Sequence, residues 1–134
     1  MEFQILGPVR ALHGGVELRL GGPRHRRLLA VLVLRAGHVV PVSRLIEALW
    51  GGTPPRSASA MVHVRMSELR AALREGRPEL LTRDGGYLLR VDPDRVDAQR
   101  FERLVASGVA ALGHGAAARA RADLLAALGL WRGP

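Results

Sequence analysis

The sequence has no cysteine, so neither a disulfide nor a thiolate metal site can hold its fold together. It also lacks a long apolar stretch, because its longest run, Leu28 to Leu34, is far shorter than the roughly 20 residues of a membrane span. The residues from Met1 to Ile5 show neither the basic start nor the apolar core of a signal peptide. These absences predict a cytoplasmic protein that does not enter a membrane.

Lysine is absent as well, and aromatic residues make up only 4% of the chain. All 20 basic residues are arginine, and with 12 acidic residues they give a formal net charge of +8. A composition rich in arginine and alanine is typical of a GC-rich genome. Whatever its origin, the positive charge still affects which partners the protein attracts. The planar guanidinium suits phosphate and guanine edges, so a nucleic acid or an acidic protein is the favoured partner.

Sequence patterns of catalysis are also missing. The five histidines are scattered, without a second metal ligand at helical spacing, and no serine nucleophile elbow occurs. The glycine pairs at 14–15, 21–22 and 51–52 are typical of turns and lack the spacing of a phosphate or dinucleotide loop. We therefore expect a protein that is not an enzyme and that binds no metal and no cofactor.

The 134 residues, 48% of them hydrophobic, are enough for one core and a small helical appendage. Two alternating segments open the chain, at residues 3–6 and 16–20, with a turn signal at His13-Gly14-Gly15 between them. This pattern predicts a small antiparallel sheet at the N-terminus.

Three helices are expected next. The first covers residues 24–36 between Pro23 and Gly37; its apolar middle is also compatible with a buried strand, but its length favours a helix packed on two sides. Ser43 is expected to cap a short helix that ends at Leu49. Residues 51–55, with two prolines, form a loop. The third helix runs from about Ser57 to Arg74.

This third helix carries an apolar stripe of Val62, Met66, Leu69 and Leu73, which we assign to the core. Away from that stripe lies a polar band with several cations and no carboxylate. Its members are Arg56, Ser59, Ala60, His63, Ser67, Arg70 and Arg74. An ordinary amphipathic surface helix would look the same, but the short helix and loop before it favour a recognition helix.

A hairpin follows directly, in which residues 80–83 pair with residues 87–91 across the turn Asp84-Gly85-Gly86. In this position it is a candidate wing, and residues 92–94 then form a linker.

The residues after this linker favour two helices. Asp97 is the expected cap of the first, and the second spans residues 116–131. The apolar residues expected to face inward are Phe101, Leu104, Val105 and Leu112 in the first helix and Leu124, Leu125, Leu128 and Trp131 in the second.

Two antiparallel helices cannot bury both of their faces alone, and such pairs normally stack on further pairs. On this ground we expect the second domain to be truncated.

Several segments match one family in order along essentially the whole chain. They are Leu6-Gly7-Pro8, Gly21-Gly22-Pro23-Arg24, Leu45-Ile46-Glu47-Ala48-Leu49-Trp50-Gly51, Val64-Arg65-Met66-Ser67-Glu68-Leu69-Arg70, Leu81-Thr82-Arg83-Asp84-Gly85-Gly86-Tyr87-Leu88-Leu89 and Phe101-Glu102-Arg103-Leu104-Val105. Together they resemble the Streptomyces antibiotic regulatory proteins (SARP). The resemblance implies an α+β fold with an OmpR-like winged helix-turn-helix over residues 1–93. From residue 96 to 134 it implies the start of a helical, tetratricopeptide-like bacterial transcriptional activation domain.

The same resemblance implies a function. Members are sequence-specific, DNA-binding transcriptional activators of antibiotic and other secondary-metabolite genes, which bind promoter direct repeats and recruit RNA polymerase holoenzyme. A homodimer on double-stranded DNA is expected with it. Two departures bear on base preference: the wing turn reads Arg83-Asp84-Gly85-Gly86-Tyr87 where many members have two prolines, and Arg65 stands where an aromatic residue is frequent.

These observations give a set of candidate DNA contacts. For the major groove they are Ser59, Ala60, His63, Ser67 and Arg70; for phosphate they are Arg24, Arg26, Arg56, Arg65 and Arg74. In the wing they are Thr82 and Arg83, of which Arg83 is implied by resemblance to enter the minor groove. The resemblance also assigns the polymerase contact to the loop of Trp50, Thr53, Pro54 and Pro55. The run Arg24-His25-Arg26-Arg27 could equally be a solvated helix end. Two other classes remain open, a protein-interaction module with an acidic partner and an RNA-binding winged helix.

Overall fold

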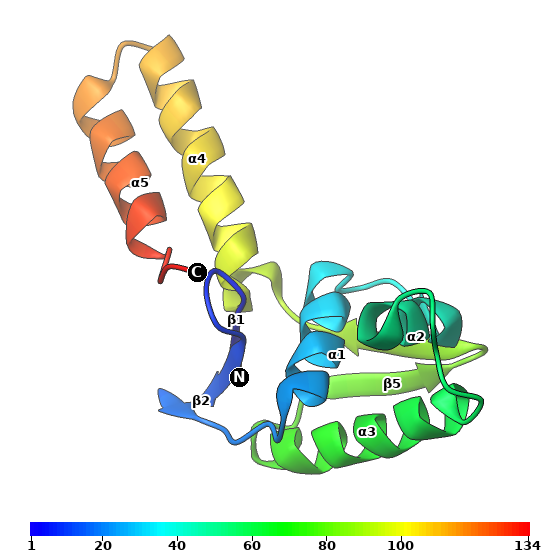
Figure 1. Cartoon of the computed structure of the whole chain (residues 1–134). Helices are drawn as coiled ribbons and strands as arrows, with labels where there is room; N and C mark the ends of the chain where they lie inside the picture. The colour runs from blue at the N-terminus through cyan, green and yellow to red at the C-terminus, as the bar shows by residue number, and fades with distance from the viewer.

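The computed structural model describes all 134 residues and has an α+β architecture. Two three-stranded antiparallel sheets and three helices form the larger part, from which a pair of helices projects (Figure 1). The predicted winged helix with a helical C-terminal segment is therefore confirmed. No helix is both long enough and apolar enough to cross a membrane.

The N-terminal sheet is built from β1 (Glu2–Gln4), β2 (Arg10–His13) and β3 (Val16–Glu17), in that order. The predicted small antiparallel sheet at the N-terminus is present, but β1 and β3 do not pair with each other directly. Gly14 and Gly15 both have positive φ angles, 58° and 79°, which is the geometry of a two-residue turn that folds β3 back onto β2. Consequently β1 pairs with β2, a strand that the sequence pattern did not reveal.

The three helices of the winged helix are α1 (Pro23–Leu34), α2 (Val42–Trp50) and α3 (Ala58–Leu73), and a 3₁₀ turn at Arg74–Gly76 extends the last of them. The expected capping of α2 by Ser43 is wrong. Pro41 has φ −62° and ψ 147°, so α2 begins at Val42 and Ser43 lies inside its first turn, without a capping hydrogen bond.

The wing consists of β5 (Glu79–Arg83) and β6 (Gly86–Arg90), and β4 (Val40–Pro41) pairs with the other edge of β6. The turn is Asp84-Gly85 alone, because Gly86 already pairs with Arg83 in the sheet. Gly86 must be glycine, since a Cβ built on it lies 2.1 Å from the carbonyl oxygen of Val40. Residues Val40 and Pro41, which connect α1 to α2, thus provide the third strand of the wing sheet.

One core of 18 buried residues joins both sheets to the three helices. The helix α1 crosses its centre and buries Leu28, Leu29, Leu32 and Val33, which confirms a helix packed on two sides rather than a strand. The predicted stripe of α3 is confirmed as well, since all four of its apolar side chains are fully buried. This packing leaves the opposite side of α3 exposed.

A 3₁₀ turn at Pro93–Arg95 leads into α4 (Asp97–Gly113), and α5 (Ala117–Gly129) runs back beside it (Figure 1). Small residues line the buried seam between the two helices. They are Gly108, Ala111, Ala120 and Ala127. The inward positions predicted for Leu112, Leu125, Leu128 and Trp131 are wrong, because these side chains are exposed. The helices approach closely at Gly108, where the side chain of Leu124 packs: a Cβ built on Gly108 would lie 2.9 Å from Cγ of Leu124.

Asp97 does not cap α4, contrary to expectation; Val96 is the capping residue and Asp97 is the first residue of the helix. Its buried carboxylate accepts hydrogen bonds from the backbone N–H groups of Ile5 (2.8 Å) and Leu6 (3.0 Å). Arg132, beyond α5, donates from its backbone to the Leu6 carbonyl and from its guanidinium to the Pro8 carbonyl. The N-terminal segment is therefore hydrogen-bonded both to the start of α4 and to the residues that follow α5.

Candidate nucleic-acid interface

The outer face of α3, meaning the side opposite its buried stripe, exposes most of the residues predicted for the major groove. Ser59, Ala60, His63 and Ser67 are all exposed, and Arg70 is half-buried. β5 lies alongside α3 (Figure 1). The two elements are joined by a hydrogen bond of 3.2 Å from Nε of Arg70 to the carbonyl of Leu80. The helix and the wing therefore present one continuous surface.

A polar cluster connects the outer face of α3 to the wing. Nη2 of Arg70 donates to Oγ1 of Thr82 at 2.6 Å, and its guanidinium carbon lies 5.4 Å from the centre of the Tyr87 ring. Nδ1 of His63 is hydrogen-bonded to the Tyr87 hydroxyl. The structure thus brings together three predicted contacts, His63, Arg70 and Thr82. Tyr87 was missed, although its place across from Thr82 in the hairpin was a signal for it.

On its other flank α3 faces the start of α1. Nη1 of Arg65 donates to Oε1 of Glu68 at 2.7 Å, and Nε2 of the buried His25 lies 3.5 Å from Oε2 of Glu68. The hydrogen bond from Arg65 lowers the pKa of Glu68; partial desolvation opposes the effect, and the charges of Arg65 and His25 add to it. The carboxylate of Glu68 is therefore held ionised mainly by Arg65, with the His25 ring on its other side.

A hollow at the start of α1 contains two of the predicted phosphate contacts. It is lined by Gly22, Pro23, Arg24, His25, Arg27 and Arg65. The first turn of α1 contains no acidic residue, and the backbone N–H groups at a helix start favour an anion. Arg26 lies elsewhere, at a second hollow beside the N-terminal sheet, so Arg24 and Arg65 are brought together but Arg26 is not.

The remaining predicted residues lie at the edges of this surface. Arg83 is exposed at the end of β5, directly before the turn, and donates from Nη1 to the Thr82 carbonyl. Arg56 and Arg74 are exposed just before and just after α3. In the loop after α2, Thr53, Pro54 and Pro55 are exposed, whereas Trp50 is half-buried with the Arg24 guanidinium 5.8 Å from its ring centre.

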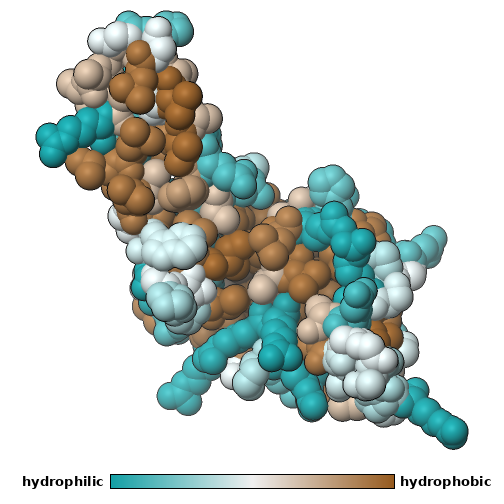
Figure 2. Space-filling view, turned by 45° about the horizontal axis from the view of Figure 1, so that its top comes forward, coloured by the Kyte–Doolittle hydropathy of each residue, from teal (hydrophilic) through white to brown (hydrophobic).

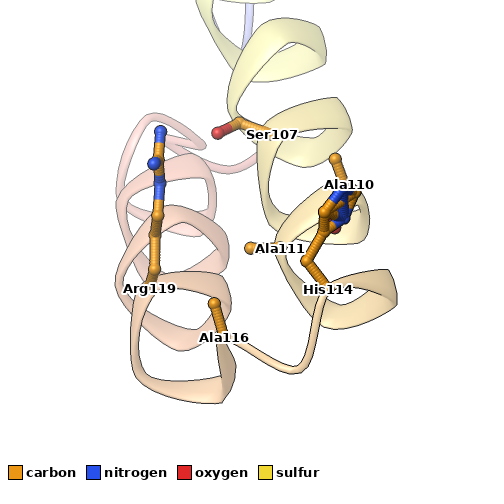
Figure 3. A pocket seen from close by; sticks show the side chains of 6 residues that line it. All are labelled: Ser107, Ala110, Ala111, His114, Ala116 and Arg119. Carbon is orange, nitrogen blue, oxygen red and sulfur yellow. The ribbon is translucent and has the colours of Figure 1, made fainter.

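The helical pair has an open hollow of its own, near the turn between α4 and α5 (Figure 3). Ser107 and Arg119 approach it from opposite helices. Their polar atoms are already engaged with Asp123, which accepts a hydrogen bond from Ser107 at 2.7 Å and lies 3.9 Å from Nε of Arg119. The hydrogen bond from Ser107 joins α4 to α5, whereas the contact between Arg119 and Asp123 lies within α5.

Comparison with known proteins finds two family matches along the chain. Residues 16–89 match the family described as "Transcriptional regulatory protein, C terminal", and residues 96–134 match "Bacterial transcriptional activator domain". The chain is 37% identical to regulatory protein AfsR of Streptomyces griseus and 36% identical to regulatory protein DnrI of Streptomyces peucetius, over 99% of its length in both cases. It is 40% identical to transcriptional regulator RedD of Streptomyces coelicolor over its whole length. The chain belongs to the SARP family.

This SARP chain spans only part of its relatives: 13% of AfsR, 52% of DnrI and 40% of RedD. A solved structure of EmbR from Mycobacterium tuberculosis, in complex with a low-affinity phosphopeptide, superposes with a TM-score of 0.94 at 35% identity. That match covers 99% of this chain and 36% of EmbR. The families and names confirm the predicted OmpR-like winged helix and a transcriptional regulatory domain rather than an enzyme.

Proposed function

We propose that this SARP domain binds double-stranded DNA sequence-specifically, with α3 in the major groove and the wing at the adjacent minor groove. The observation that carries the proposal is the continuous surface of α3 and β5. It has arginines before and beyond the helix, and the carboxylate of Glu68 on its flank forms an ion pair with Arg65. Such a surface favours phosphate on both sides of an exposed helix.

Each group of residues has its own part. Ser59, Ala60, His63, Ser67 and Arg70 face the base edges; two guanidinium nitrogens of Arg70 already donate to the wing, which leaves its remaining donors for a base. Arg24, Arg26, Arg56, Arg65 and Arg74 contact phosphates. Thr82 and Arg83 bring the wing to the minor groove, where a long cation responds to groove width and A·T content.

We further propose that the domain belongs to a cytoplasmic transcriptional activator of secondary-metabolite genes. In this proposal two copies bind a promoter direct repeat, and the loop with Trp50, Thr53, Pro54 and Pro55 contacts RNA polymerase holoenzyme. The regulatory names of the relatives and the exposure of this loop beside α3 support it. Band shifts on one repeat and on two test the stoichiometry, and equal affinity per site at every spacing contradicts it.

The salt dependence of binding tests the central proposal. Duplexes selected by the protein from a randomised library serve as the probe. If about five phosphates are neutralised, log K falls with log salt at a slope of about −4 to −5. Duplex RNA at matched salt is the competitor that tests the RNA-binding alternative. A flat salt response contradicts nucleic-acid binding, and equal binding of duplex RNA contradicts the choice of DNA.

The wing is tested by Arg83→Ala. This change removes the exposed cation at the end of β5, so we expect weaker binding to every duplex and a smaller preference for A·T-rich flanks. Arg121→Ala is the matched control, because it removes the same charge from an exposed position on α5. If Arg83→Ala stays within about twofold of the control on all sequences, the wing does not contact DNA as proposed.

A further inference from the structure

The middle of the outer face of α3 is apolar. Ala60, Val64, Ser67 and Ala71 follow one another at spacings of four, three and four residues, so they form one line along the helix. All four are exposed, and the Val64 side chain has 54% of its surface accessible. Val64 lies two residues from Val62 and Met66 on either side, both of which are fully buried, so it faces away from the core.

The polar residues beside this line are turned away from it. Toward the wing, His63 bonds to Tyr87 and Arg70 bonds to Thr82 and Leu80. Toward α1, Arg65 bonds to Glu68. The line between these two flanks therefore presents methyl groups and a single hydroxyl, that of Ser67.

The surroundings of the line indicate what it contacts. Exposed arginines lie before the helix, after it and at the wing turn, at Arg56, Arg74 and Arg83. An apolar protein surface would leave these charges without partners, whereas a DNA duplex places phosphates on both sides of its major groove. Within that groove the C5 methyl of thymine is the apolar group on the base edges.

We propose that Val64, with Ala60 and Ser67 beside it, contacts a thymine methyl group and makes the domain selective for thymine at that position. This inference rests on the proposed insertion of α3 into the major groove and adds the base that its centre recognises. Contact between two methyl groups removes both from water, and only thymine among the four bases offers one there. Val64 is thus a specificity-determining residue.

The test removes the methyl group from the DNA and from the protein in turn. In the selected duplex each thymine is replaced singly by deoxyuridine, which pairs in the same way and lacks only the C5 methyl. For the unmodified protein we expect one or two positions at which binding weakens by about three- to fivefold, the factor that corresponds to one buried methyl group. At those positions the Val64→Ala variant is expected to bind the thymine duplex and the deoxyuridine duplex equally well.

Val109→Ala is the matched control, because Val109 is a similarly exposed valine on α4, with 60% of its surface accessible. This variant is expected to keep the full deoxyuridine sensitivity of the unmodified protein. Val64→Thr keeps one of the two methyl groups and is expected to lose part of the sensitivity. Since Val64 is exposed and alanine favours helices, a thermal melt of Val64→Ala should match that of the control.

Two results overturn the inference. One is an equal loss for the unmodified protein and Val64→Ala at every substituted thymine; the other is a selected duplex in which no thymine substitution matters. In both cases salt-dependent duplex binding would persist, so the proposed function would stand while this inference fell. If no duplex bound at all, both would fall together.

Discussion

The winged helix and the helical pair bury different kinds of residue. The winged helix fills its core with large side chains, such as Phe3, Leu28 and Met66, all fully buried. The buried seam residues of the helical pair are one glycine and three alanines, and several of its large apolar residues are exposed. In Figure 2 these apolar side chains gather over the projecting helices, whereas hydrophilic ones extend from the rest of the molecule.

This difference shows two ways of stabilising a small unit. The winged helix obtains its free energy from large apolar area removed from water within its own fold. The helical pair gains close contact between backbones, the hydrogen bond from Ser107 to Asp123, and its attachment to the N-terminal segment through Asp97 and Arg132. An exposed apolar side of this kind is typical of stacked helical pairs.

The largest effect is expected from truncating a core leucine. Leu32→Ala leaves a cavity in the centre of α1, where the side chain is fully buried, and should cost about 2–5 kcal/mol of unfolding free energy. Leu128→Ala removes the same atoms from an α5 position that is 65% exposed and should change stability by less than about 0.5 kcal/mol. Urea denaturation of the two variants measures the contrast. Equal losses would mean that both regions rely on large buried side chains.

The next effect concerns the two glycines at close approaches. Gly86→Ala forces a methyl group onto the backbone of β4, which cannot yield, so a loss of about 3 kcal/mol is expected. Gly108→Ala meets mainly the side chain of Leu124, which can move, and alanine gains roughly 1 kcal/mol of helix propensity. We expect a net change for Gly108→Ala below about 1 kcal/mol. A larger loss at Gly108 than at Gly86 in thermal unfolding would reverse the comparison.

A third prediction addresses the attachment between the two regions. Asp97→Ala leaves the backbone N–H groups of Ile5 and Leu6 without their acceptor and should cost about 1–3 kcal/mol. Asp97→Asn retains one acceptor oxygen and should cost less. Glu102→Gln, which removes a charge from an exposed position on α4, is the control. Hydrogen exchange at Ile5 and Leu6 should accelerate in Asp97→Ala only; unchanged exchange there would show that the carboxylate does not hold this segment.

The smallest effect is a pH dependence at the contact between α1 and α3. Glu68 has its pKa lowered from 4.5 in the folded state, so folding favours its ionised form. The stability that it contributes is present above pH 4.5 and is lost as the pH falls through the lower folded pKa. The difference in stability between the unmodified protein and Glu68→Gln should therefore shrink on acidification. A difference that stays constant or grows in acid would contradict the contact with Arg65 and His25.

Local patterns predicted much of the fold. The apolar run of α1, the stripe of α3 and the Asp84-Gly85 turn act over a few residues and fix the type of each element. The strands β2 and β4 were missed because they are short and bury only one residue each, Ala11 and Val40, so they carry little pattern of their own. They exist because neighbouring strands supply their hydrogen bonds.

The candidate site divides in the same way. The sequence placed His63, Ser67 and Arg70 on the outer face of α3, but it could not show where each side chain turns. Arg70 turns to the wing and Arg65 turns to Glu68 because β5 and α1 offer partners there. The proposed role of Val64 follows from this arrangement, because the neighbouring polar side chains bind the wing and Glu68 and leave Val64 exposed in the middle of the helix.

The sequence by itself determined the order and type of the helices and of the wing hairpin, the net charge and the family. These properties depend on periodicity, turn chemistry and composition, which act locally or add along the chain. Tertiary structure alone decided that the Asp97 carboxylate binds the N-terminal segment in addition to the backbone N–H of Ala98 in its own helix. It also decided that Leu112, Leu125 and Leu128 of the helical pair stay exposed. Both outcomes depend on which surfaces approach each other, and residues more than 90 positions apart meet only when the chain has folded.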